Sequence, residues 1–211
     1  QQASPLADYL GPEITAGIQR VMRAPVTVLG SYHQIIPSNW KLYVENVKDT
    51  YHASLLHSFF TTFRLNRLSQ KGGLIINGSG GGHVSFTMAA DSGGKEYEQA
   101  GMRAAHEGMR LEAPEILASV DEFGDGVGLQ ILAVFPNFVL QQIRNSLAVR
   151  RVIPRGIDSC ELVWIAFGFA DDTSEMTERR MLQSNLIGPA GYISMEDGAA
   201  PGFVQRVAPS A

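Results

Sequence analysis

The sequence contains one cysteine, Cys160, no long run of apolar residues and no cluster of basic residues. A single thiol cannot form a disulfide within the chain, which excludes a small disulfide-stabilised extracellular fold. No segment reaches the roughly 18 apolar residues that a membrane-spanning helix needs. The formal charge of −4, without a basic patch, argues against a nucleic-acid-binding protein. We therefore expect a cytoplasmic protein with no nucleic-acid partner and no membrane partner.

The composition is that of a folded globular protein. Hydrophobic residues make up 45% and charged residues 18% of the 211 residues, which excludes disordered and coiled-coil chains. A chain of this length can bury a large core. No internal repeat and no linker divides the sequence, so we expect a single domain over residues 1–211.

Hydrophobic periodicity predicts both helices and strands. Apolar residues at helical spacing predict helices over residues 8–23, 40–60, 95–118 and 174–185, the last with Thr173 as N-cap. Runs of β-branched and aromatic residues predict strands over residues 26–36, 83–90, 126–135, 138–153 and 160–169. The glycine-rich segment 71–82 is expected to form a mobile loop or a turn. Short turns between the later strands favour antiparallel pairing. The expected fold is α+β, a curved antiparallel sheet gripping a long helix around a ligand cavity.

Two histidines, His52 and His57, lie five residues apart within the predicted helix 40–60. On a regular helix such side chains point about 140° apart, so both can reach one metal ion only if the helix is distorted between them. The spacing alone leaves two interpretations open. The pair consists either of ordinary hydrogen-bonded histidines or of two ligands to one metal.

The longer string NWKLYVENVKDTYHASLLH, residues 39–57, resembles the iron-binding segment of Rieske-type aromatic-ring-hydroxylating dioxygenase α subunits. The resemblance continues in order through FFTTF, VFPNFVLQQIRNS, FGFADD and NLIGPAGYISMEDG, and it covers most of the chain. It implies the catalytic domain of an oxidoreductase, with a START-like helix-grip fold and one mononuclear iron(II) ion. The implied reaction adds O₂ to an arene to give a cis-dihydrodiol, with electrons from NADH through a separate reductase.

The resemblance also implies roles for individual residues. His52, His57 and Asp197 match the iron ligands, a set of two imidazoles and one carboxylate that leaves positions open for O₂. Glu196 is the competing candidate for the third ligand. Asp49 matches an aspartate that bridges an iron-ligating histidine to the electron donor of a neighbouring subunit, and its alternative is a plain helix-surface acid.

Two further polar groups complete this part of the expected site. Asn46 matches a position close to the iron, and its alternative is an amide that caps a backbone group. The aromatic and branched residues expected to line the cavity, although each can equally be plain core, are Phe59, Phe60, Ile131 and Val134.

The segments DYLGPEI, HASLLHSFFTTF, NRLSQKGG and ISMEDG are most similar to the large subunits of terephthalate dioxygenases, and relatives that act on salicylate, anthranilate and halobenzoates share much of them. All take benzoate-type anions, which implies Arg150 as a bidentate carboxylate-binding residue and Ser85 as a second donor to the same carboxylate. Arg150 and Arg151 are neighbours on a predicted strand, so only one can face the cavity. Alternation alone does not decide which.

One expected component is missing from the chain. A Rieske [2Fe–2S] cluster needs two cysteines and two histidines, as Cys-x-His and Cys-x-x-His, and neither pair is present. Cys160 is expected to be a small apolar core residue. The cluster is therefore expected in an N-terminal domain outside this chain. The resemblance further implies α subunits in a trimer, a possible β subunit and a reductase as partners. Two alternatives remain, a monohydroxylase of the same family and a non-catalytic START-like carrier.

Overall fold

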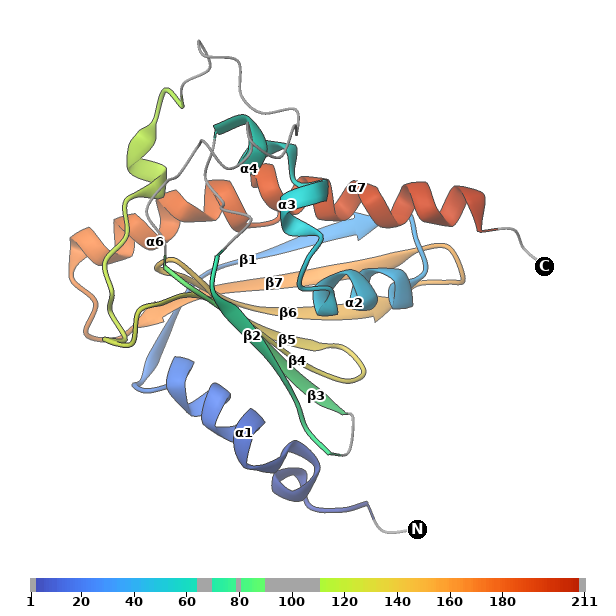
Figure 1. Ribbon diagram of the computed structural model, residues 1–211, viewed down its shortest axis with the longest axis horizontal. Coiled ribbons are helices and arrows are strands. Elements are labelled where there is room, and N and C mark those ends of the chain that lie inside the picture. Colours follow the sequence, from blue (N-terminus) through green and yellow to red (C-terminus); the bar gives the residue numbers. More distant parts are fainter. Residues whose placement is uncertain (1–2, 64–69, 79–80, 90–110, 209–211) are drawn as a thin grey trace.

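The computed structural model describes residues 3–63, 70–78, 81–89 and 111–208. Its centre is a seven-stranded antiparallel sheet in the order β1-β7-β6-β5-β4-β3-β2, strongly twisted from one edge to the other (Figure 1). From β2 to β7 each strand pairs with the next one along the chain, which confirms the expected meander. The strands are β1 Val26–Ile36, β2 Gly72–Ile76, β3 Gly82–Met88, β4 Val127–Val134, β5 Phe138–Ile143, β6 Ser146–Pro154 and β7 Cys160–Phe169.

Helices cover both faces of the sheet (Figure 1). One face is covered by α1, which contacts β3 and β4, and the other by α2, α6 and α7. The helices are α1 Leu6–Val21, α2 Trp40–Lys48, α3 Ala53–Leu56, α4 Ser58–Phe63, α6 Ser174–Ile187 and α7 Tyr192–Val207, with a 3₁₀ turn η1 at Pro114–Leu117. This arrangement confirms the expected α+β class.

Alternating side chains build two apolar layers. Leu132 on β4 is fully buried beneath α1, whereas its neighbour Ala133 belongs to the cluster beneath α2. Along β6, Leu147 and Ala148 divide in the same way. Because side chains alternate along a strand, an apolar residue at nearly every position means that both faces are covered. The α2 face is the one that carries the site described below.

The expected helix over residues 40–60 is wrong as a single element. It breaks after Lys48 into α2, α3 and α4, because Asp49 adopts an extended conformation with φ −68° and ψ 122°. The Asp49 carboxylate oxygen Oδ1 accepts the backbone N–H groups of Tyr51, at 2.9 Å, and His52, at 3.3 Å. Such a side-chain bond competes with helical hydrogen bonding, which explains the break.

The glycine-rich segment is not a loop through its whole length, which corrects the expectation for residues 71–82. Residues Gly72–Ile76 form the edge strand β2 and pair with β3. Gly73 lies against the ring of Phe86, where an added Cβ atom would stand only 2.7 Å from Phe86 Cζ. The glycine therefore makes room for a neighbouring aromatic ring instead of marking a mobile connection.

Three further expectations differ from the structure or lie outside it. The run 138–153 is a hairpin of two strands, turned at Arg144 with φ 54°, a turn without the usual glycine. Helix α7 was not expected, because it contains Gly198, Pro201 and Gly202. The predicted helix 95–118 lies mostly outside the described residues, and its described end holds only η1.

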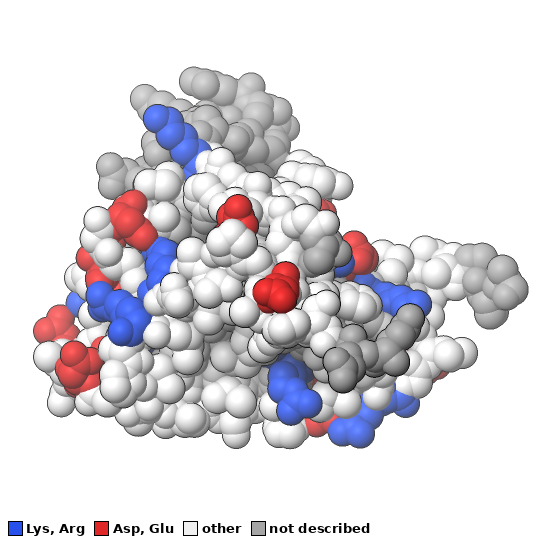
Figure 2. Space-filling model, turned by 90° about the horizontal axis from the view of Figure 1, so that it is seen from below, with Lys and Arg blue, Asp and Glu red and all other residues white. Residues whose placement is uncertain are grey.

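The surface carries mixed charge. On the face seen in Figure 2, described Lys and Arg side chains are interspersed with Asp and Glu. In the described ranges, no helix combines the length and the apolar character needed to cross a bilayer.

Candidate metal centre

Three predicted ligands converge on the α2 face of the sheet. Nε2 of His52 lies 3.4 Å from Oδ1 of Asp197, and Nε2 of His57 lies 3.3 Å from the same oxygen. One ligand atom from each residue falls within 4.8 Å of the others. Two ligands bound at about 2.1 Å and at right angles to each other stand about 3 Å apart. The spacing therefore fits one metal ion held on one side by two imidazoles and a carboxylate.

A separate short helix, α3, lies between the two histidines. His52 precedes α3 and His57 follows it, so the two rings are carried by the ends of a single helical turn. Their ring centroids are 5.2 Å apart. On one continuous helix they would point about 140° apart. The rings nevertheless lie close together, while the extended residues, Asp49 and His57, flank this helical turn instead of interrupting it.

Asp197 reaches the two rings from α7, which packs closely against α2 and β1. An added Cβ atom on Gly198 would stand 3.0 Å from Nε2 of Gln34, and one on Gly202 would stand 3.4 Å from Cγ of Pro37. These two glycines, one turn apart, let α7 approach the first strand. Gly198, next to Asp197, has the closer of these two contacts, whereas a Cβ atom on Gly202 would make an ordinary van der Waals contact.

The carboxylate and the imidazoles influence each other's protonation. Burial raises the pKa of Asp197. The hydrogen bond from His52 and the charge on His57 lower this pKa by a larger amount, so the net shift is downward. Burial lowers the pKa of His52, but the hydrogen bond and charge of Asp197, with the charge of Asp49, raise it above its usual value. The centre therefore favours positive charge at the point where the three side chains meet.

Glu196, the competing third ligand, lies on the other side of His57. Its Oε2 is 2.9 Å from Nδ1 of His57, the ring nitrogen that faces away from Asp197. Its Oε1 accepts the hydroxyl of Ser58, at 2.5 Å, and the backbone N–H of Phe59, at 3.3 Å. In this position Glu196 orients the ring of His57, a frequent arrangement around metal-bound histidines.

Asn46 and Asp49 also lie beside the three side chains. Nδ2 of Asn46 donates to Oδ1 of Asp197 at 2.9 Å, so its partner is the carboxylate and not a backbone group. Oδ2 of Asp49 is 3.7 Å from Nδ1 of His52, beyond hydrogen-bond distance. In the described part of the chain this buried nitrogen has no hydrogen-bond partner. Asp49 therefore lies beside His52 without the hydrogen bond that joins Glu196 to His57.

Arg150 faces the α2 side of the sheet, while Arg151 is exposed on the opposite side. The Arg150 side chain is only 4% exposed, and its Nη1 donates to the hydroxyl of Tyr43 at 2.8 Å. Its guanidinium lies 5.0 Å above the ring of Trp164. Within the described ranges Arg150 has no carboxylate partner, and its buried Nε makes no hydrogen bond. A buried and unpaired cation is rare in proteins.

Ser85 lies on the same face, on β3, with its hydroxyl donating to the backbone oxygen of Ile131 at 3.3 Å. Two strands separate Ser85 from Arg150. Three strand spacings of about 4.8 Å amount to about 14 Å along a flat sheet. The binding of one carboxylate group by both residues therefore stays a prediction from the sequence.

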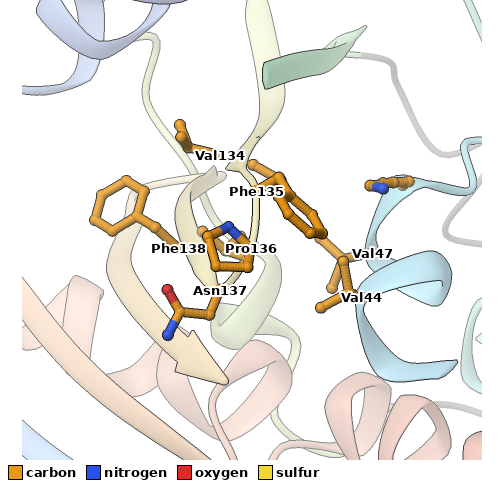
Figure 3. A pocket seen from close by; sticks show the side chains of 10 residues that line it. Val44, Val47, Val134, Phe135, Pro136, Asn137 and Phe138 are labelled. Atoms are coloured by element: carbon orange, nitrogen blue, oxygen red, sulfur yellow. The ribbon is translucent and has the colours of Figure 1, made fainter. Parts of the chain in front are cut away.

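The expected cavity-lining residues divide among several places. Phe59 is buried in a cluster with Leu186 and Ile187, and Phe60 contacts the ring of His57 edge-on with centroids 5.5 Å apart. Val134 belongs to the α1 side of the core. At its strand end it also lines the small apolar hollow of Figure 3, between α2 and the β4–β5 turn. Side chains of α2 and of the β4–β5 turn meet around this hollow, and none of its lining residues is a predicted metal ligand.

The sequence interpretation missed Tyr43 as a neighbour of Arg150. Tyr43 is three residues before Asn46, so both lie on one side of α2. Burial raises the pKa of the Tyr43 hydroxyl, Arg150 lowers it and the charge of Asp197 raises it, with a net upward shift. In the sequence, the i, i+3 spacing of Tyr43 and Asn46 on a helix close to two histidines could have indicated that Tyr43 lies near the site.

Comparison with known proteins decides the family. Residues 18–207 match the family of ring-hydroxylating α subunits, in the part described as the catalytic domain. The chain belongs to this family. The resemblance found in the sequence motifs is therefore confirmed.

Several members of the family are similar over almost the whole chain. One relative is subunit alpha 2 of the terminal oxygenase component of terephthalate 1,2-dioxygenase from Comamonas sp. It is 59% identical over 95% of this chain and 49% of its own length. The large subunit of anthranilate 1,2-dioxygenase from Burkholderia cepacia is 44% identical over 96% of this chain and 48% of its own. The large oxygenase component of salicylate 5-hydroxylase from Ralstonia sp. is 39% identical over 96% of this chain and 49% of its own length. The chain thus spans about half the length of these relatives.

The fold also agrees with solved structures. Naphthalene 1,2-dioxygenase from Rhodococcus sp. superposes with a TM-score of 0.71 over 98% of this chain and 50% of its own, at 19% identity. This similarity confirms the helix-gripping antiparallel sheet as a fold of the ring-hydroxylating α subunits.

Proposed function

We propose that this chain is the catalytic domain of a ring-hydroxylating oxygenase in which His52, His57 and Asp197 hold one iron(II) ion, and that its substrate is a benzoate-type aromatic acid. The convergence of the three ligand atoms within 4.8 Å, in a chain of this family, is the observation that supports the oxygenase most strongly. A non-catalytic carrier of the same fold has no use for such a set of ligands.

Bound iron(II) supplies activation of O₂, with electrons that originate from NADH and pass through a reductase and a [2Fe–2S] cluster. The residues of this chain orient the centre. Glu196 fixes the tautomer of His57, and Asn46 holds the carboxylate of Asp197. Asp49, beside His52, is the proposed connection to the electron donor of a neighbouring subunit. The chain lacks the cysteine pairs for a cluster, so that donor belongs to another part of the assembly.

The buried guanidinium of Arg150 supports an anionic substrate. A buried cation without a carboxylate partner is costly, and an arriving carboxylate supplies both the opposite charge and an acceptor for Nε of Arg150. Terephthalate, anthranilate and salicylate, the compounds in the names of the relatives, all carry an aromatic carboxylate. Ser85, opposite Ile131 on the same face, stays a further proposed donor to the substrate carboxylate.

We further propose the assembly implied by the sequence motifs: α subunits in a trimer, optionally with β subunits, served by a separate reductase. In this proposal the intact subunit carries a Rieske domain in addition to residues 1–211. The relative named as a salicylate hydroxylase supports monohydroxylation as a second outcome on the same centre.

Turnover under ¹⁸O₂ tests the proposed reaction. The intact α subunit and its reductase would be given terephthalate, anthranilate, salicylate and 2-chlorobenzoate, with toluene as a neutral control. We expect NADH-dependent oxidation of at least one acid, with two labelled oxygen atoms in a cis-dihydrodiol. A single labelled oxygen would indicate the hydroxylase. Oxidation of the neutral arene alone would contradict the assignment of an aromatic acid.

The role of Glu196 leads to a graded prediction. Glu196→Leu removes the acceptor for Nδ1 of His57, so we expect iron affinity to fall by about 10- to 100-fold, as is typical for such partners. Glu196→Gln keeps an acceptor oxygen and should weaken binding less. Competition titration with a chromophoric chelator measures both affinities. Iron loss as complete as that caused by Asp197→Ala would instead mean that Glu196 is itself a ligand.

A further inference from the structure

Two neighbouring strands carry buried hydrogen-bond donors that lack a partner in the described part of the chain. Gln141 on β5 is 1% exposed, and its Nε2 has no acceptor. Arg150 on β6 is 4% exposed, and its Nε likewise has none. Buried donors are paired in the great majority of structures, so two unpaired donors on adjacent strands indicate an acceptor that arrives with a ligand.

The register of the sheet brings the two side chains together. Arg150 is opposite Val139, and Gln141 is opposite Ala148, so Gln141 and Arg150 are diagonal neighbours on one face. Diagonal neighbours across paired strands are about 7–8 Å apart, within reach of two long side chains that meet at one small group. The adjacent Gln142 points to the other face, where it pairs with Arg20.

A small hollow, about the size of one water molecule, lies beside Gln141. A hollow between α6 and the sheet is lined by Gln141 and Trp164, and between them by the small side chains of Ala148 and Ala166. Nε1 of Trp164 is also buried without a partner among the described residues. Ser85, by comparison, already donates its hydroxyl hydrogen to Ile131.

We propose that Gln141 is a substrate-binding residue that donates a hydrogen bond from Nε2 to the substrate carboxylate held by Arg150. Arg150 donates from Nε to one carboxylate oxygen and Gln141 donates to the other, so the pair selects a planar anionic group. This assignment rests on the proposed function, because it names the second donor for the aromatic acid. It places Gln141, and not Ser85, beside Arg150.

Calorimetric titration of the iron-loaded intact α subunit with terephthalate and salicylate, in the absence of O₂, tests the assignment. Gln141→Leu keeps the size of the side chain but removes the donor, so we expect about a tenfold or greater loss of affinity for the acids. Gln141→Glu places a carboxylate next to Arg150. We expect it to raise the melting temperature without substrate and to reduce acid affinity by more than about 100-fold, because the arriving anion is repelled.

Gln142→Leu is the matched control, since Gln142 is the adjacent buried glutamine on β5 but faces the opposite side of the sheet, where it pairs with Arg20. It should bind the acids as the wild type does. If the wild type binds acids and both Gln141 variants bind them equally well, this inference is wrong while the proposed function stands. If the wild type binds none of the acids, the proposed substrate class and this inference both fail.

Discussion

Replacing His52 with alanine is expected to reduce the affinity for iron(II) by more than about 100-fold, beyond the range caused by loss of an orienting partner. His52 supplies one of the three ligand atoms, and the remaining pair of His57 and Asp197 leaves too few protein ligands for a stable centre. Activity of the intact subunit should fall to background. Iron content after gel filtration, measured by plasma emission spectroscopy, checks the first effect, and product formation checks the second.

His33→Ala is the matched control for this experiment. His33 is a largely exposed histidine on β1 whose Nδ1 pairs with Glu161, away from the metal centre. We expect this variant to keep wild-type iron content. Equal iron loss in both variants would mean that the effect comes from destabilisation of the fold and not from loss of a ligand.

Replacing Arg150 with methionine is expected to remove most of the affinity for aromatic acids while leaving the ligand-free fold as stable as before or more stable. Truncating one partner of a buried charged hydrogen bond costs about 2–5 kcal/mol in binding, which is about 30-fold or more in affinity. Without substrate the guanidinium of Arg150 is a buried charge with no carboxylate partner in the described ranges, so its removal relieves a desolvation cost that offsets the lost hydrogen bond to Tyr43 and the lost contact with Trp164.

Thermal unfolding with and without ligand measures both parts of this prediction. At a free acid concentration of about 100 times the dissociation constant, the wild type should gain about 2.7 kcal/mol in free energy of unfolding. The Arg150→Met variant should gain almost nothing. Arg151→Met, which changes the exposed neighbour on the opposite face, should gain as much as the wild type. A full gain in the Arg150 variant would refute the assignment of a carboxylate-binding residue.

Parts of the fold with strong periodicity were predictable from sequence. The strands Val26–Ile36 and Cys160–Phe169 have the expected bounds, because each is a long run rich in β-branched and aromatic residues. Thr173 caps α6 as expected, with its hydroxyl oxygen accepting the backbone N–H of Met176. Here local propensity and tertiary structure agree.

Elsewhere tertiary contacts outweighed local propensity. The glycines of β2 and α7 indicate loops when taken alone, but Gly73 makes room for Phe86 and Gly198 makes room for Gln34. Sequence cannot show which residue across the fold requires that space. The break at Asp49 depends on one side-chain carboxylate that accepts two backbone N–H groups. Hydrophobic periodicity carries no information about such a hydrogen bond.

The site was predictable in residue type but not in geometry. The motifs indicated two histidines and a distant acid, yet they could not separate Glu196 from Asp197, which are adjacent on a helix that was itself not expected. The structure distinguishes them by the ring nitrogen of His57 that each acid faces. Gln141 was overlooked, because a glutamine within a strand becomes informative only when its burial and its lack of a partner are known.

Anomalous X-ray diffraction at the iron absorption edge, on crystals of the iron-loaded intact subunit, tests the metal centre most directly. We predict one anomalous peak in residues 1–211, about 2.1 Å from Nε2 of His52, Nε2 of His57 and a carboxylate oxygen of Asp197. A peak bound by Glu196 in place of Asp197, or no peak between the two histidines, would contradict the proposed centre.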